Sequence, residues 1–205
     1  MATFPRMRKV KLWIGMSLDG FTSGVNEQLD WLVPYVTAPE GMAIFRRLRE
    51  PCDTVLLGRV NYEGFFGYWP AVKNDPKASR DDADISRWLD KVPKIVFSRT
   101  LREVKWENAR LAKADAAEEV AALKRAPGKD ILIQNSTRLT RSLLEAGLVD
   151  ELNITVAPVV VGEGRALFAG LKRRIDLRQA ESSRFDNGTL YLRYEVKPRE
   201  PKAGG

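Results

Sequence analysis

The sequence contains no histidine and only one cysteine, Cys52, among its 205 residues. Without histidine, the Ser-His-Asp and Cys-His catalytic arrangements are excluded, and the commonest zinc ligand is missing. A single cysteine cannot form a disulfide within the chain, which favours a reducing compartment. The carboxylates form no tight cluster in the sequence, so we predict no metal site. Acid–base chemistry would have to come from Asp, Glu, Tyr, Lys or water.

Long apolar runs are also missing, and none approaches the ~20 residues that a membrane-spanning helix needs. The basic N-terminal stretch alternates Lys with apolar residues, a pattern typical of a strand and not of a signal peptide. Hydrophobic residues make up 44% of the chain and charged residues 30%, which is typical of a soluble globular protein. We therefore expect a cytoplasmic protein that does not associate with membranes.

The net charge of +7 has two interpretations. It can be ordinary solvated surface, or it can attract an anionic cofactor or nucleic acid. Basic residues precede any acid at the N-terminus and cluster again at residues 172–174. No aromatic-rich basic motif accompanies them, so we do not predict a nucleic-acid partner.

Short apolar strands alternate with amphipathic segments along the chain. The patterns predict strands at 10–16, 53–58, 93–97, 131–133 and 152–161, and helices at 39–50, 59–66, 80–91, 114–125 and 137–146, with a loop at 70–78. Asn187-Gly188 lies between residues 178–185 and 189–196, and this dipeptide is the strongest short signal for a β-hairpin. We predict an α/β fold: a mixed, mostly parallel sheet with helices on both faces and a C-terminal antiparallel hairpin. A single domain would span 1–197, and 198–205 would be a flexible tail.

Three of the predicted strands end in residues suited to bind phosphate. Gly58-Arg59 pairs a glycine, which permits close backbone approach, with a guanidinium at a helix N-terminus. Ser98-Arg99-Thr100 offers hydroxyls and an Arg, a combination that suits a ribose 2′-phosphate and so favours NADPH over NADH. Gln134-Asn135-Ser136-Thr137 opens into another helix, where Asn135 or Ser136 is expected to cap the first turn. Each motif has a purely structural alternative, but parallel strands would bring all three to one edge of the sheet.

Two further motifs need separate interpretation. Ser17-Leu18-Asp19-Gly20 follows the first strand, and Asp19 is either a proton relay or part of an Asp-Gly turn. Gly162-x-Gly164 resembles the start of a dinucleotide fingerprint, but Leu167 stands where the third glycine belongs. We therefore interpret it as a turn between strands.

Five segments resemble the reductase-domain family of riboflavin biosynthesis, in its stand-alone, dihydrofolate-reductase-like branch. They read MSLDGF, LLGRVNYEGF, KIVFSRTL, PGKDILIQNS and LLEAGLVDELNITVAPVVVGEGRALF, and they extend over nearly the whole chain. The resemblance implies a dihydrofolate-reductase-like three-layer fold, NADPH binding and hydride transfer. It places Gly58 and Arg59 near the cofactor phosphates, Ser98, Arg99 and Thr100 near the 2′-phosphate, and Asn135, Ser136 and Thr137 over the pyrophosphate. It also implies a homodimer formed through residues 157–169.

The substrate side is predicted to include Ser17, Gly20, Trp31 and Tyr62, with Asp19 as the catalytic residue. Candidate substrates are a ribosylaminopyrimidine or a pterin. The chain departs from the family at Asn135-Ser136-Thr137, where relatives carry glycines. This departure leaves an alternative open, a non-catalytic nucleotide-binding or sensing descendant of the same fold.

Overall fold

A computed structural model describes residues 6–198 of the chain. Eight strands, six α-helices and one short 3-10 helix follow one another in the described part. Their bounds are β1 (Val10–Ser17), the 3-10 helix (Val25–Glu27), α1 (Val33–Val36), α2 (Pro39–Arg49), β2 (Cys52–Gly58), α3 (Arg59–Val72), α4 (Arg80–Lys91), β3 (Lys94–Phe97), β4 (Ala109–Leu111), α5 (Ala116–Arg125), β5 (Asp130–Gln134), α6 (Thr137–Glu145), β6 (Glu151–Ala157), β7 (Leu177–Arg184) and β8 (Leu190–Val196).

All eight strands join one sheet in the order β4-β3-β2-β5-β1-β6-β8-β7. The first six in this order are parallel to one another, whereas β8 and β7 pair antiparallel at one edge. The carboxyl ends of the parallel strands therefore lie along one side of the sheet, which we call the carboxyl edge. Ligands of open α/β sheets bind at such an edge.

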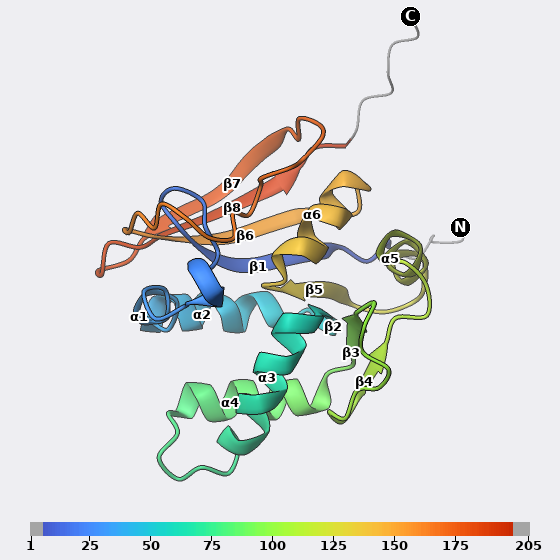
Figure 1. Cartoon of the computed structure of the whole chain (residues 1–205), viewed down its shortest axis with the longest axis horizontal. Coiled ribbons are helices and arrows are strands. Elements are labelled where there is room, and N and C mark those ends of the chain that lie inside the picture. Colours follow the sequence, from blue (N-terminus) through green and yellow to red (C-terminus); the bar gives the residue numbers. More distant parts are fainter. Residues whose placement is uncertain (1–5, 199–205) are drawn as a thin grey trace, which may run out of the picture.

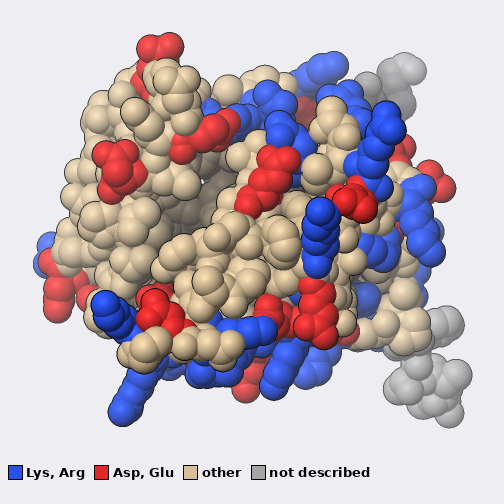
Figure 2. Space-filling view, turned by 60° about the horizontal axis from the view of Figure 1, so that its bottom comes forward, with Lys and Arg blue, Asp and Glu red and all other residues tan. Residues whose placement is uncertain are grey.

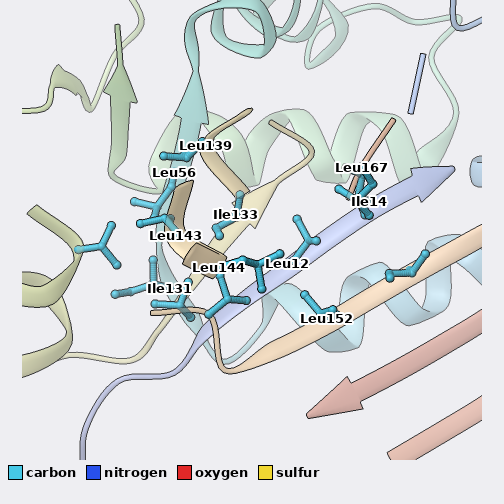
Figure 3. Packing of buried hydrophobic residues seen from close by; sticks show 14 of the residues in the cluster. Leu12, Ile14, Leu56, Ile131, Ile133, Leu139, Leu143, Leu144, Leu152 and Leu167 are labelled. Atoms are coloured by element: carbon cyan, nitrogen blue, oxygen red, sulfur yellow. The ribbon is translucent and has the colours of Figure 1, made fainter. Parts of the chain in front are cut away.

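Helices cover both faces of the sheet (Figure 1). On one face, α5 and α6 pack on apolar residues of β1, β5 and β6. Figure 3 shows Leu139, Leu143 and Leu144 of α6 against Leu12 and Ile131 of the sheet. On the other face, α2, α3 and α4 enclose a second core that is richer in aromatic rings. The central strands β2, β3 and β5 are thus covered on both sides, which explains why they read as continuous apolar runs.

The predicted fold class is confirmed, down to the C-terminal hairpin, where Gly188 has a φ of +85°. Four local expectations were wrong. The helix after β2 continues through Pro70 to Val72, because this proline lies in the last turn and disturbs little of the helix. The strand predicted to run to 161 ends at Ala157, before Pro158. The short elements α1 and β4 were not predicted.

Within residues 6–198, no helix is long and apolar enough to span a membrane. Except for Pro198, the predicted flexible tail lies outside the described residues.

Candidate functional site

The ends of β2 and β5 are neighbours at the carboxyl edge and are joined by side chains. The Gly58 N–H donates to Ser136 Oγ (2.9 Å), and the Ser136 N–H donates to Asn61 Oδ1 (3.0 Å). The Ser136 hydroxyl in turn lies 3.1 Å from the main-chain oxygen of Gln134. These contacts fix the start of α3 against the start of α6, so two of the three predicted strand ends are brought together.

The turn before α6 has an unusual backbone. Asn135 and Ser136 both have left-handed φ values, +55° and +62°. This conformation costs non-glycine residues energy, and it turns the Ser136 side chain inward toward Gly58 and away from the helix. Neither residue caps α6 with its side chain, so the expectation of a capping Asn135 or Ser136 was wrong.

Some helices of the molecule begin with a side-chain cap and others, including α1 and α2, begin without one. α4 is capped by Ser79 and α5 by Asp115, whose side chains accept from backbone N–H groups of the first turn. α3 and α6, which begin at the ends of β2 and β5, have no side-chain cap among the described residues. Uncapped N–H groups and the helix dipole attract anions. The two uncapped helices therefore form a place suited to a phosphate group.

The predicted phosphate-binding side chains lie at the expected strand ends. Arg59 is the first residue of α3, and its guanidinium pairs with Glu63 one turn along the helix (2.8 Å), with both side chains nearly half exposed. Arg99 and Thr100 are exposed just beyond β3, and Ser98 Oγ accepts from the N–H groups of Thr100 and Leu101. Because β3 is next to β2 in the sheet, this turn flanks the uncapped start of α3.

Asp19 is held by three donors. Its carboxylate accepts from the Ser17 hydroxyl (2.6 Å) and from the N–H groups of Val161 (3.1 Å) and Gly162 (2.7 Å). The Ser17 hydrogen bond, followed by these backbone bonds, lowers the pKa of Asp19 below its usual 3.8. The environment favours the ionised carboxylate, which makes Asp19 a poor proton donor and a good anchor for the loop after β1.

The loop after β1 is also joined to α6 and to the chain after β6. Thr22 and Thr137 share a hydroxyl–hydroxyl hydrogen bond of 2.7 Å, which directs the Thr137 side chain toward this loop. Gly164 packs so closely that a Cβ there would lie 2.1 Å from the Ser23 oxygen, and its φ is +144°. Gly162 and Gly164 thus serve a tight turn, as interpreted from the sequence.

The substrate-side predictions divide into two groups. Ser17 ends β1 and Gly20 lies in the loop after it. Trp31 follows on the same connection, with its indole Nε1 buried and without a hydrogen-bond partner in the described structure. Tyr62 does not join them. It is 4% exposed, stacks on Phe66, and its hydroxyl accepts the Lys105 N–H (2.8 Å). Tyr62 therefore supports the core between α3 and the β3–β4 connection.

Gln134, at the last position of β5, was not assigned a role of its own from the sequence. It is 5% exposed, and its Oε1 is buried without a hydrogen-bond partner among residues 6–198. Side chains alternate along a strand, so Gln134 faces the same side as Leu132, toward α2 and α3. An unpaired buried amide oxygen at a strand end is costly, and a bound molecule at this position would satisfy it. The signal in the sequence was a single polar residue ending the run DILIQ.

Charges of both signs are mixed over the face shown in Figure 2, which is hollowed left of its centre, where most of the visible surface is uncharged. No group of three or more potential metal ligands occurs in the described residues. The positive charge of the chain is thus not gathered into one basic patch on this face.

Comparisons with known proteins agree with this fold. The model of the RibD C-terminal domain matches residues 8–191. The Bacillus subtilis protein YyaP is 32% identical over 92% of this chain and 95% of its own length. A crystal structure of a Shewanella sp. PV-4 protein assigned to riboflavin biosynthesis superposes with a TM-score of 0.72 at 24% identity, covering 93% of this chain and 99% of that one.

A bifunctional deaminase/reductase of Thermotoga maritima, named for diaminohydroxyphosphoribosylaminopyrimidine deaminase and 5-amino-6-(5-phosphoribosylamino)uracil reductase, superposes with a TM-score of 0.64 at 13% identity. The match covers 93% of this chain but 57% of that protein. The fold is therefore the reductase-like fold of riboflavin-pathway proteins. The chain belongs to the RibD C-terminal domain family.

Proposed function

We propose that this protein is an NADPH-dependent reductase that transfers a hydride to a small heterocyclic substrate of the ribosylaminopyrimidine or pterin type. The observation that carries the proposal is the pair of uncapped helix N-termini, α3 and α6, held together by Gly58 and Ser136 at the carboxyl edge. Their free N–H groups suit the pyrophosphate of a dinucleotide. The bound cofactor would supply the hydride.

The order of the strands supports one orientation for the cofactor. Ser98, Arg99 and Thr100 at the end of β3 would hold the 2′-phosphate, because hydroxyls and a guanidinium suit that group. β2 and β5 come next in the sheet, and there Arg59 would leave Glu63 to reach the pyrophosphate. Exchange of this partner costs little, because an exposed ion pair contributes ~0.3–0.5 kcal/mol.

Residues of this chain fit a nicotinamide and a flat substrate at the ends of β5 and β1. We assign to Gln134 the task of pairing its free amide with a carboxamide or ring N–H, which would satisfy Oε1. Asp19 would hold Ser17 and the loop through Gly20 in place as a positioning residue, since its lowered pKa disfavours proton donation. Trp31 would direct its unpaired indole N–H toward the substrate side.

A second candidate function rests on the turn Asn135-Ser136-Thr137. The hydroxyls of Ser136 and Thr137 are already used by Gly58 and Thr22, so both are engaged within the protein before a phosphate arrives. This favours, as an alternative, a non-catalytic nucleotide-binding or sensing protein of the same fold. For either function we propose a cytoplasmic homodimer formed through residues 157–169, where Val160 and Phe168 are 69% and 38% exposed. The molecular mass in solution measures this assembly.

Titration with NADPH, followed by its fluorescence, tests the proposal in wild type, Gly58→Ala and Gly67→Ala. A Cβ on Gly58 would meet Ser136 at 3.8 Å, an ordinary contact, so the fold is retained while the methyl group occupies the phosphate approach. We expect NADPH affinity to fall at least tenfold in Gly58→Ala. Gly67→Ala, in the helix that follows Gly58 and facing open space, is the control and should bind like wild type.

The absence of binding at millimolar NADPH would exclude both the reductase and the nucleotide-sensing alternative. Binding without oxidation of NADPH by a panel of pterins and ribosylaminopyrimidines would favour the sensing alternative. Unchanged affinity in Gly58→Ala would place the cofactor elsewhere.

A further inference from the structure

A cavity of about 250 Å³ lies between the carboxyl-terminal half of α2 and the antiparallel part of the sheet, away from the carboxyl edge. Lys11 on its wall is six residues before Ser17, which places the cavity about 20 Å from the end of β1 at ~3.3 Å per residue. The lining residues are Lys11, Arg47, Leu48, Glu151, Asn153, Glu181, Tyr191 and Arg193. None of them belongs to the site proposed for NADPH.

The walls are polar where a covered sheet face is normally apolar. The register puts Lys11 beside Glu151, and it sets Asn153, Arg193 and Glu181 in one row across β6, β8 and β7. Asn153 is fully buried and Glu151 is 5% exposed. Burial of such groups destabilises a fold unless they are well paired, and natural sequences break the apolar pattern mostly at functional sites.

The pairing inside the cavity is incomplete at Arg193. Its Nε is buried, lies 3.3 Å from Glu181 Oε2 and still forms no hydrogen bond in the described structure. Its Nη1 is 3.8 Å from Glu151 Oε2, too far for a hydrogen bond. The other Glu151 oxygen accepts from Asn153 Nδ2 (3.0 Å), and Asn153 Oδ1 accepts from the Tyr191 hydroxyl (2.8 Å). One guanidinium and one carboxylate oxygen therefore face the cavity with unused hydrogen-bonding capacity.

Charges of both signs line the cavity. Three cations, Lys11, Arg47 and Arg193, face two carboxylates, Glu151 and Glu181. Lys11 is already paired with Asp130 (2.9 Å), and Arg47 with Glu181 (2.7 Å). The groups left with unused hydrogen-bonding capacity are thus one cation, Arg193, and one carboxylate oxygen of Glu151, so a ligand with one charge of each sign would match both, whereas a singly charged ligand would match only one. A space of about 250 Å³ corresponds to about eight water molecules at ~30 Å³ each, which is enough for an amino acid.

We propose that this cavity binds a small zwitterion of amino-acid size. The carboxylate of the ligand pairs with the Arg193 guanidinium, and its ammonium pairs with Glu151 Oε2. Neither interaction depends on NADPH, so this binding site can be tested independently of the proposed reductase function.

Three matched probes test the site by NMR titration of the full chain. L-alanine carries both charges, propionate lacks the ammonium, and ethylammonium lacks the carboxylate. We expect L-alanine to shift the Arg193 side-chain Nε–H resonance saturably, with propionate and ethylammonium at least tenfold weaker. L-glutamine, which fills more of the cavity, should bind more tightly than L-alanine.

Variants distinguish binding in the cavity from binding to surface charge in general. Arg193→Gln should lower the affinity for L-alanine at least tenfold, as followed by backbone amide shifts around the cavity. Arg178→Gln is the matched control, because Arg178 pairs with Glu195 outside the cavity, and it should bind like wild type. If Arg193→Gln fails to fold, Glu151→Gln replaces it and should show the same loss. No saturable shift with either amino acid, equal binding of a singly charged probe, or full binding by the cavity variant overturns the proposal.

Discussion

Arg8 and Arg59 lie at opposite edges of the sheet and have different surroundings. Arg8 precedes β1 at the edge where the parallel strands begin, which we call the amino edge. It is 5% exposed, pairs with Asp53, and donates to Thr54 Oγ1 (2.7 Å) and to the main-chain oxygen of Lys129 (2.6 Å). Arg59 at the carboxyl edge has one exposed partner on its own helix. The same side chain is part of the fold in one place and free to change partner in the other.

Carboxylates, backbone N–H groups and a side-chain amide show the same difference between the two edges of the sheet. At the amino edge, Asp150 accepts the Val10 N–H (2.7 Å) and pairs with Lys124, while Asp130 pairs with Lys11. At the carboxyl edge, α3 and α6 begin without side-chain caps, and the Gln134 amide oxygen has no partner among the described residues. Arg8, Asp130 and Asp150 are thus satisfied by the protein itself, whereas the groups at the starts of α3 and α6 are left for a ligand.

The largest effect that tests this contrast is expected from Asp53→Ala. We predict that it lowers the free energy of unfolding by about 3–5 kcal/mol, because the buried Arg8 guanidinium loses its counter-ion. NADPH affinity should be unchanged. Urea unfolding measures the first quantity and fluorescence titration the second.

Glu63→Ala is the matched variant at the carboxyl edge. It removes the exposed partner of Arg59 and should change the free energy of unfolding by no more than ~0.5 kcal/mol. Equal losses in the two variants would remove the distinction between the edges.

The sequence predicted the frame of the fold well because the parallel strands are covered on both faces. The continuously apolar run Val55-Leu56-Leu57 predicts a buried strand, and Asn187-Gly188 predicts the position of the hairpin turn. β4 has three residues of intermediate burial at the sheet edge, so no pattern marks it. The continuation of α3 through Pro70 is accompanied by an edge-on contact of Trp69 with Phe65 across the last turns, a packing interaction that no local pattern shows.

The candidate site was predictable only as separate strand ends. Each motif could be found in the sequence because a glycine, hydroxyl or Arg follows an apolar run. The contact that joins Gly58 to Ser136 spans 78 positions, so no local pattern reveals it. Capping was expected at Ser136 from its residue type, whereas the left-handed turn directs its hydroxyl to another strand. The role proposed for Gln134 depends on a missing partner, which is visible only in three dimensions.

A second test at the amino edge concerns Lys94, the first residue of β3, and the pH dependence that it gives to the free energy of unfolding. This side chain is 1% exposed, donates to the main-chain oxygens of Leu89 and Val92, and lies 4.7 Å from the Trp106 ring centroid. Burial lowers the pKa of Lys94 from 10.5 to about 8. The unfolded chain keeps this proton up to about 10.5 and the folded chain loses it near 8, so unfolding takes up a proton between these values.

The Lys94 contribution to the free energy of unfolding should therefore rise with pH between about 8 and 10.5, by on the order of 3 kcal/mol in total, and stay constant below 8. Cys52 acts oppositely, because burial raises its pKa from 9.0 to about 12 and unfolding then releases a proton. The measurement is thus the difference between wild type and Lys94→Met in urea unfolding across this range. A difference that does not vary with pH would contradict the assignment.

The last test concerns Arg99, which is exposed beyond β3. Arg99→Ala should leave the free energy of unfolding unchanged within ~0.5 kcal/mol, as expected for a surface substitution. It should weaken NADPH by about 2 kcal/mol, or roughly 30-fold, because a charge-assisted contact to the 2′-phosphate is lost. NADH lacks that phosphate and should bind equally to both proteins. Parallel titrations with NADPH and NADH measure the ratio of the two affinities. An equal loss of affinity for both cofactors would place Arg99 outside the 2′-phosphate site. It would not contradict the pyrophosphate site proposed at α3 and α6.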